Sequence, residues 1–162
     1  MAWILQLRFV EVDNKDLIVA VEHNVVLIPY GGGTNVTQAL MLEERETRMI
    51  VSVDMSRMNK VLWVDRANNT AGVECGILGR DLEKELAKYG MICGHEPDSV
   101  EFSSLGGWIS TRASGMKKNV YGNIENVVES MRLVTAVGTF TKTCEAPRVS
   151  TGPDLTNFVM GA

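Results

Sequence analysis

The sequence predicts a single α+β domain, and three observations support this prediction. A chain of 162 residues with 45% hydrophobic residues is long enough to bury one core. Short apolar runs typical of strands occur along the chain, and so do segments with helical periodicity. The two kinds of segment do not alternate strictly, which favours an α+β arrangement over a doubly wound parallel sheet.

The first half of the chain is predicted to hold one helix and several strands. Leu17, Val21 and Ala20 can share an apolar face, which predicts a helix over residues 15–23 capped by Asp13 or Asn14. The expected strands are residues 25–28, 49–53, 61–65 and 70–77, the last two forming an antiparallel pair around a turn at residues 67–69. We expect the strand at 25–28 to be buried and to stop at Pro29.

Two helices are predicted in the middle of the chain. Leu78, Leu82, Leu86 and Tyr89 lie on one face of the first, which Gly90 ends. The pairs Asp81–Lys84 and Glu85–Lys88 can form on its polar face. The second helix falls within residues 104–114 and begins at Ser103 or Ser104. It contains Gly106 and Gly107, which cost helix stability and therefore indicate a close approach of another segment.

Towards the C-terminus, strands are expected at residues 127–134 and 139–142 around a turn at Gly138. A further turn at residues 151–154 precedes a short apolar segment.

Composition and charge exclude several classes of protein. The net charge of -4 and the absence of a basic run longer than Lys117 and Lys118 exclude a dedicated nucleic-acid surface. The apolar start of the chain lacks the features of a signal peptide or a membrane span. Cys75, Cys93 and Cys144 are too widely spaced for a disulfide framework or a zinc site, which favours a reducing compartment or an organelle matrix.

A glycine-rich loop is the first place that could carry chemistry. Its residues are Pro29, Tyr30, Gly31, Gly32, Gly33, Thr34 and Asn35. Successive glycines allow positive φ angles, so that neighbouring N–H groups can converge on a phosphate or pyrophosphate oxygen. The alternative is a plain turn that ends a strand. The loop matches neither the P-loop pattern nor the Gly-x-Gly-x-x-Gly pattern of the ordinary dinucleotide fold.

A second segment, residues 94–108, places hydroxyl groups and glycines ahead of the second predicted helix. A helix N-terminus without bulky side chains can bind an anion, whereas the alternative is an irregular loop with an ordinary capping serine. His95 has no partner histidine nearby in the sequence. We therefore interpret it as a hydrogen-bonded structural residue rather than a metal ligand, and we predict no metal site.

The residues after this helix leave alternatives open. Arg112 could reach the same ligand or form a surface ion pair. Lys117 and Lys118 could be solvated or contact an anionic substrate or lipid, with the solvated face preferred. Tyr121 could stack on a planar ring or simply pack in the core.

Three motifs together resemble a known family. They are Pro-x-Gly-Gly-Gly-Thr from Pro29, the run Gly-His-Glu-Pro-Asp-Ser-x-Glu-Phe-Ser-x-Leu-Gly-Gly-Trp that begins at Gly94 and continues to Glu125, and Ser-Thr-Gly-Pro-Asp from Ser150. The chain resembles the alkyldihydroxyacetonephosphate synthases, which belong to the vanillyl-alcohol-oxidase type of flavoproteins. The resemblance covers residues 25–161.

This resemblance implies a PCMH-type FAD-binding domain of two small α+β subdomains with FAD between them. It implies that residues 1–162 form one such domain, incomplete at its C-terminus. The cofactor-binding residues that it implies are Pro29, Tyr30, Gly31, Gly32, Gly33, Thr34 and Asn35, then Asp98, Ser99, Val100, Glu101, Phe102, Ser103 and Ser104, and finally Thr111, Arg112, Ala113 and Ser114. Asn35 stands where serine is common in the family, which preserves a hydrogen-bonding side chain.

The reaction is also an expectation from the resemblance. In the family, the acyl group of acyl-dihydroxyacetone phosphate is exchanged for a long-chain alcohol, and the flavin serves as an electron sink. The catalytic side chains lie in a cap domain outside this sequence, so we nominate none here. The family implies a peroxisome or related organelle and leaves a homodimer and a peripheral membrane contact open. The alternatives are an FAD-dependent oxidoreductase acting on a hydroxy acid or alcohol and a non-catalytic FAD-binding fragment.

Overall fold

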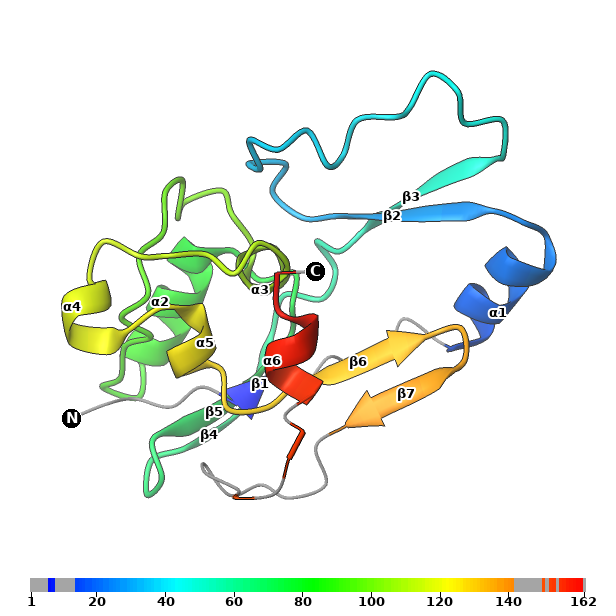
Figure 1. The fold of residues 1–162 in the computed structure, drawn as a ribbon. Helices are drawn as coiled ribbons and strands as arrows, with labels where there is room; N and C mark the ends of the chain where they lie inside the picture. The colour runs from blue at the N-terminus through cyan, green and yellow to red at the C-terminus, as the bar shows by residue number, and fades with distance from the viewer. Residues whose placement is uncertain (1–5, 8–13, 142–149, 151, 154, 162) are drawn as a thin grey trace.

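The strands form three small sheets, and together with the helices they confirm the predicted α+β class (Figure 1). The structure is a computed structural model that describes residues 6–7, 14–141, 150, 152–153 and 155–161. The first sheet has the order β1 (Gln6–Leu7), β5 (Thr70–Val73) and β4 (Val61–Asp65). The second pairs β2 (Val26–Tyr30) with β3 (Ile50–Asp54), and the third pairs β6 (Arg132–Thr135) with β7 (Gly138–Thr141).

The sheets mix both directions of pairing. β4 and β5 are antiparallel, as predicted, and so are β6 and β7. β2 and β3 run parallel, and β1 runs parallel to β5. The described helices are α1 (Asn14–Glu22), α2 (Gly79–Ala87), α3 (Leu105–Ser110), α4 (Lys118–Tyr121), α5 (Ile124–Val127) and α6 (Leu155–Val159).

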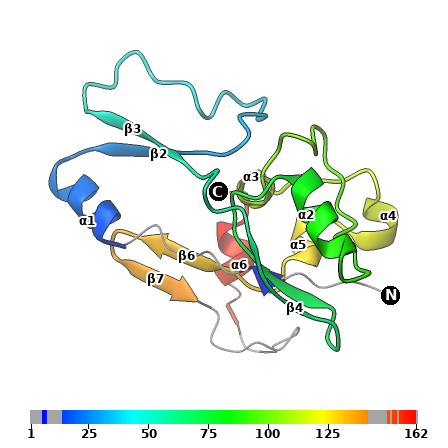
Figure 2. The same ribbon diagram turned by 180° about the vertical axis from the view of Figure 1, so that it is seen from behind.

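One part of the molecule, which we call the core lobe, holds the buried apolar residues. It consists of β4, β5 and α2 to α5, residues 61–131, and α6 packs against it (Figures 1 and 2). Leu82 and Leu86 of α2 are almost completely buried, because their spacing puts both on the inward face of the helix. The buried cluster comprises Ala71, Val73, Ile77, Leu82, Leu86, Met91, Cys93, Leu105, Trp108, Ile109, Ile124, Val127, Val128, Met131 and Met160.

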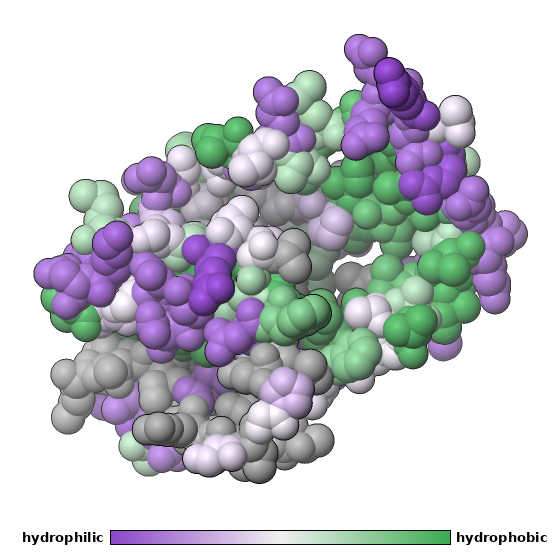
Figure 3. Space-filling view, viewed as in Figure 1, coloured by the Kyte–Doolittle hydropathy of each residue, from purple (hydrophilic) through white to green (hydrophobic). Residues whose placement is uncertain are grey.

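The other part, which we call the glycine-loop lobe, consists of α1, β2, β3 and the loop between the strands, residues 14–54. Among its described residues Ala20 is the only buried hydrophobic side chain. Val21 is 65% exposed and Val51 is 40% exposed. In Figure 3, hydrophobic residues lie at the surface of this lobe, on the right of the view.

Burial of β2 was predicted wrongly. Its side chains are partly exposed or exposed, and the strand continues through Pro29 to Tyr30. Because β3 is its one partner within the described residues, β2 has an open edge, where proline is tolerated in a strand. The apolar face predicted for α1 is also mostly exposed, although the helix itself is confirmed.

Two short helices and two strand boundaries differ from the prediction, and the strand expected over 70–77 ends at Val73. α4 and α5 were not expected, and Val127 lies at the end of α5 rather than in a strand. The strand expected over 127–134 therefore begins only at Arg132. Of the predicted ion pairs on α2, Glu85–Lys88 forms at 2.5 Å, whereas Asp81 lies 3.6 Å from Arg80.

Some predictions fall outside the part of the chain that the structure describes. They concern Asp13 as a cap, Cys144, Lys142 at the end of a strand, and Thr151 and Asp154 in the last turn. Cys75 and Cys93 are buried free thiols. No helix within the described ranges is long and apolar enough to cross a membrane.

Candidate cofactor site

The glycine loop and the segment before α3 lie against each other. A Cβ atom added at Gly31 would collide with Oγ of Ser104, and one added at Gly32 would collide with the carbonyl oxygen of Phe102. At Gly32 main chain therefore packs on main chain, which only glycine permits, and at Gly31 it packs on the Ser104 side chain. The fold brings together two segments that the sequence predicted to form one site.

The N–H groups of the glycine loop are free to bind a ligand. No N–H group from Gly31 to Asn35 donates a hydrogen bond to any residue that the structure describes. Gly33 has a φ of +67°, which favours glycine and turns the chain so that neighbouring N–H groups can converge. The Asn35 side chain supports the loop, because its Oδ1 accepts a hydrogen bond from Ala39 N–H at 3.1 Å. This arrangement fits an anionic phosphate or pyrophosphate.

At the start of α3 the structure favours the second of the two alternatives, an ordinary capping serine, over an anion site formed by the helix N–H groups. The N–H of Leu105 donates to the carbonyl of Ile77 at 3.0 Å, and that of Gly106 donates to the carbonyl of Cys75 at 2.7 Å. The N–H of Gly107 donates to Oγ of Ser104 at 3.4 Å. Ser104 is thus the predicted capping residue, but the first donors of the helix are already used within the protein.

The glycines of α3 allow a close approach of another segment, as the sequence indicated. A Cβ atom at Gly106 would lie 3.1 Å from both Cβ and the carbonyl oxygen of Cys75. The helix therefore approaches the segment after β5 closely, which secures the position of Ser104 beneath the glycine loop.

A buried aromatic pair supports the same segment from behind. Trp108 Nε1 donates to Oγ of Ser103 at 2.7 Å, and both residues are buried. The ring of His95 meets the indole edge-to-face, with centroids 5.2 Å apart. This contact orients the indole and, through it, the hydroxyl group of Ser103.

His95 is buried against Trp108, and the hydrogen bonding expected of it was predicted wrongly. Its side chain is 1% exposed, and neither ring nitrogen has a partner among the described residues. Burial lowers the pKa of His95 to about 4, against an opposing effect of Glu125. The imidazole is therefore neutral at physiological pH.

The two remaining predicted segments share an unusual backbone conformation. Ser99 has a φ of +56° and Arg112 a φ of +48°, in the left-handed region that non-glycine residues rarely adopt. The carbonyl of Ser99 accepts hydrogen bonds from the N–H groups of Phe102 and Ser103, at 2.9 and 2.8 Å, which close a tight turn. Such conformations cluster at ligand-binding places, so both positions agree with a site here.

The segment after α3 is held mostly by its own side chains. Thr111 Oγ1 donates to the carbonyl of Gly107, and Ser114 Oγ donates to Oδ1 of Asn123, each at 2.9 Å. Arg112 Nε lies 3.4 Å from Oε1 of Glu125. The ion pair that the sequence left open for Arg112 is therefore present. It is not a fully exposed surface pair, because the Glu125 side chain is only 19% exposed.

Three interactions that the sequence did not single out hold the chain around His95. The Glu83 carboxylate accepts the N–H of Gly94 at 3.1 Å. The Tyr121 ring packs over Gly94, where an added Cβ atom would lie 2.7 Å from it. Lys117 pairs with Glu96 at 2.5 Å. Tyr121 is thus a packed residue and Lys117 an ion-pair partner, whereas Glu83 was hidden among the polar residues of α2.

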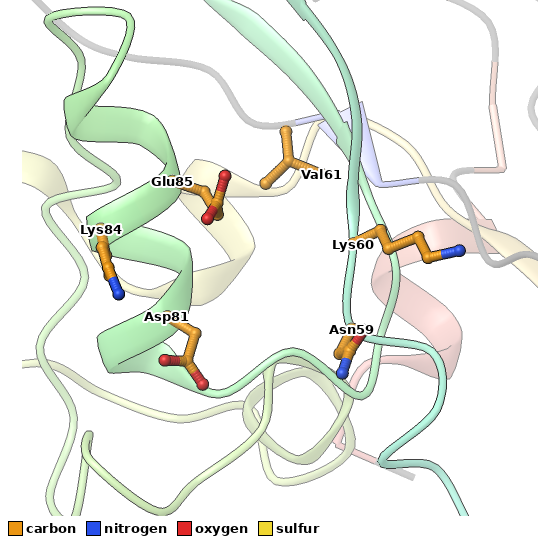
Figure 4. Close-up of a pocket in the computed structure, with 6 residues that line it drawn as sticks. All are labelled: Asn59, Lys60, Val61, Asp81, Lys84 and Glu85. Atoms are coloured by element: carbon orange, nitrogen blue, oxygen red, sulfur yellow. The ribbon is translucent and has the colours of Figure 1, made fainter.

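A shallow pocket of about 420 Å³ lies elsewhere, between the start of β4 and α2 (Figure 4). Lys60, Asp81 and Glu85 are among its lining residues, and Lys60 points away from both carboxylates. No residue of the predicted cofactor site lines it. The described part of the chain also contains no group of His, Cys, Asp and Glu side chains that could hold a metal ion.

The fold and the glycine loop define a nucleotide-binding flavoprotein domain. The chain belongs to the family described as "FAD binding domain", whose profile matches residues 15–143. FAD is therefore its cofactor, and the free N–H groups at Gly31 to Asn35 fit its phosphates.

The comparisons with individual proteins are more specific. An alkyldihydroxyacetonephosphate synthase of Caenorhabditis elegans is 52% identical over 143 residues, which are 88% of this chain and 24% of the relative. The synthase of Trypanosoma brucei brucei is 45% identical over 91% of this chain and 24% of its own length. A solved alkyldihydroxyacetonephosphate synthase structure superposes with a TM-score of 0.84 at 44% identity, covering 91% of this chain and 26% of that one. This chain therefore spans about a quarter of the length of these relatives.

Proposed function

We propose that this chain is the FAD-binding part of an alkyldihydroxyacetonephosphate synthase, which exchanges the acyl group of acyl-dihydroxyacetone phosphate for a long-chain alcohol. One observation carries the proposal. Identity to the synthases reaches 52% over 88% of the chain, whereas the related FAD-linked oxidoreductase YgcU of Escherichia coli is 35% identical over 68% of it. The run from Gly94 to Glu125, which resembles the synthases in particular, supports the same assignment.

The residues of this chain would bind and orient the cofactor. The N–H groups from Gly31 to Asn35 would hold its phosphate oxygens, and the loop could not accept side chains at Gly31 or Gly32. Ser103 and Ser104 lie against this loop, with Ser103 fixed by Trp108. Bound FAD would supply an electron sink for exchange at the dihydroxyacetone phosphate carbon. We assign no catalytic side chain to the described residues.

The direct test is an assay of the full-length protein with acyl-dihydroxyacetone phosphate and hexadecanol. We expect alkyl-dihydroxyacetone phosphate and free fatty acid in equal amounts, with both substrates and FAD required. A Gly32→Ala variant should lose activity together with its bound FAD. A folded, FAD-loaded protein that forms no alkyl ether under these conditions would refute the proposed function.

The second candidate is an FAD-dependent oxidoreductase that acts on a hydroxy acid or alcohol. A D-lactate dehydrogenase of Anaerostipes hadrus is 31% identical over 69% of the chain, which favours this candidate more weakly. Bleaching of the flavin absorption by D-lactate, glycolate or an alcohol without oxygen would support it. We expect no bleaching with these compounds.

We further propose a peroxisome or a related organelle as the location of the full-length protein, and a homodimer with peripheral membrane contact as its state. The resemblance to the synthases supports each of these. Imaging of the tagged protein beside a peroxisomal marker tests the first. Sedimentation equilibrium tests the dimer, and flotation with phospholipid vesicles tests the membrane contact.

A further inference from the structure

A partly buried carboxylate lies beside one of the expected cofactor residues. Oε1 of Glu125 is 3.4 Å from Nε of Arg112, and the Glu125 side chain is only 19% exposed. Its other oxygen, Oε2, is fully buried and has no partner among the described residues. Burial of an ionised carboxylate is costly unless a nearby cation compensates it, and within the described residues Arg112 is the cation paired with it.

The local fold holds Glu125 at this place. The N–H of Ile124 donates to the carbonyl of Ala113 at 3.3 Å, and Ser114 Oγ donates to Oδ1 of Asn123. Asn126 Oδ1 accepts the N–H of Asn123 at 3.0 Å, which completes the start of α5. Ile124 is completely buried in the core. The short helix α5 is therefore fastened to the residues that follow Arg112 and carries Glu125 towards it.

Arg112 is fixed at its backbone and open at its far end. Its N–H donates to the carbonyl of Ile109 at 3.1 Å, and its φ is +48°. Its side chain is 51% exposed, and its terminal NH groups form no hydrogen bond with a residue that the structure describes. A guanidinium group is a rigid fork of five donors, so a partner at Nε sets the direction of the terminal groups.

We propose that Glu125 is a positioning residue for the cofactor: it holds the Nε side of Arg112 so that the terminal NH groups face an oxygen acceptor of FAD. Glu125 does not touch FAD itself. This inference rests on the proposed function and on the cofactor role that the resemblance to the synthases implies for Arg112. The acceptor is either a pyrophosphate oxygen or a carbonyl oxygen of the flavin ring, since both accept hydrogen bonds from a guanidinium group.

A double-mutant cycle on FAD affinity tests the proposal in the full-length protein. The variants are Glu125→Gln, Arg112→Ala and the two combined, with FAD binding followed by flavin fluorescence and folding by circular dichroism. Glu125→Gln keeps the shape of the side chain and removes its charge. We expect it to weaken FAD binding about tenfold alone, and less than about twofold when Arg112 is already alanine, because its effect acts through that residue.

A matched control comes from another carboxylate with a cationic partner. Glu85 pairs with Lys88 on α2 at 2.5 Å, away from the cofactor segments. Glu85→Gln should leave FAD affinity unchanged, since an exposed pair of this kind contributes little. Titration of the same variants with ADP and with riboflavin then identifies the acceptor. A loss that appears with ADP assigns it to the pyrophosphate, and a loss that appears with riboflavin assigns it to the ring.

The overturning outcomes are distinct. Equal effects of Glu125→Gln with and without Arg112 would mean that Glu125 does not act through Arg112. Unchanged FAD affinity in Arg112→Ala would overturn the inference as well as the role of Arg112. If Glu125→Gln does not fold, Arg112→Lys serves instead, because lysine keeps the charge and lacks the fork. It should bind FAD as weakly as Arg112→Ala, and wild-type affinity would overturn the inference. Absence of alkyl-ether synthesis with intact FAD binding would refute only the proposed reaction.

Discussion

The core lobe buries many of its apolar residues, whereas the glycine-loop lobe leaves most of its apolar residues exposed or partly exposed. Residues 61–131 supply almost the whole buried cluster, including Leu82 at 0% exposure, whereas residues 14–54 bury only Ala20 among their described hydrophobic side chains. Yet the free N–H groups belong to the second lobe. The comparison shows that different lobes supply stability and ligand binding. The core lobe provides the packed apolar interior, and the glycine-loop lobe provides the backbone N–H groups for the ligand.

The largest expected effect is a loss of stability in the core lobe. Leu82 packs on the inward face of α2, so Leu82→Ala removes buried apolar atoms and leaves a cavity. We expect the free energy of unfolding to fall by about 3 kcal/mol. Urea unfolding followed by circular dichroism measures it, with Leu62→Ala as a control, because Leu62 is 39% exposed. A similar loss in both variants would mean that the cost does not depend on the burial of the leucine side chain.

The next effect concerns acid sensitivity, which the core lobe should carry through His95. Burial lowers its folded pKa to about 4 from an ordinary 6.5, with Glu125 opposing the shift. Because the unfolded chain binds the proton more readily, the stability from this group is complete above pH 6.5 and is lost as the pH falls from 6.5 towards 4.

We expect this loss to reach about 3 kcal/mol in wild type and to be absent in His95→Gln. Urea unfolding of both proteins at several pH values between neutral and acidic measures the difference. Parallel curves for the two proteins would show that His95 does not titrate in this way.

A smaller change in free energy is expected for FAD binding when the contact between the two lobes is altered. Gly32→Ala places a Cβ atom on the carbonyl of Phe102 and must push the glycine loop away. We expect FAD affinity to fall at least about tenfold, which corresponds to about 1.4 kcal/mol. Fluorescence titration measures it. Gly152→Ala is the control, because an added Cβ atom there meets nothing within 4 Å; a comparable loss in that variant would argue against a specific contact.

The smallest effect is expected on the surface of the glycine-loop lobe. Val51 on β3 is 40% exposed, so Val51→Ala should cost less than about 1 kcal/mol in the free energy of unfolding. Thermal unfolding of the full-length protein measures it. A cost as large as that of Leu82→Ala would show that Val51 is covered there and would end the contrast between the lobes.

The sequence could predict those parts of the fold that depend on local patterns. α2 follows from its leucine spacing, and the β4–β5 hairpin from two apolar runs around an asparagine turn. α4 and α5 have four residues each, too few to show a helical period. Val21 and Val51 look like core residues in any local window, because the window does not reveal which face another segment covers.

The candidate site divides in the same way. The glycine loop could be found because runs of glycine have a local meaning. The sequence could not show that the first N–H groups of α3 are already hydrogen-bonded. Their acceptors are the carbonyl groups of Cys75 and Ile77, which lie far back in the chain. Likewise, Glu125 acquires its relation to Arg112 only because α5 folds back on residues 113 and 114.

The bond from the Trp108 indole to Ser103 has a practical consequence for spectroscopy. The indole is buried in the core lobe and reaches through this bond to a residue of the cofactor segment, whereas Trp63 lies on β4 in the first sheet. Tryptophan emission overlaps the absorption of flavin, so excitation energy should pass from this ring to bound FAD. In a variant that keeps Trp108 and replaces Trp3 and Trp63 by phenylalanine, quenching of the remaining emission would follow cofactor binding in real time without a label.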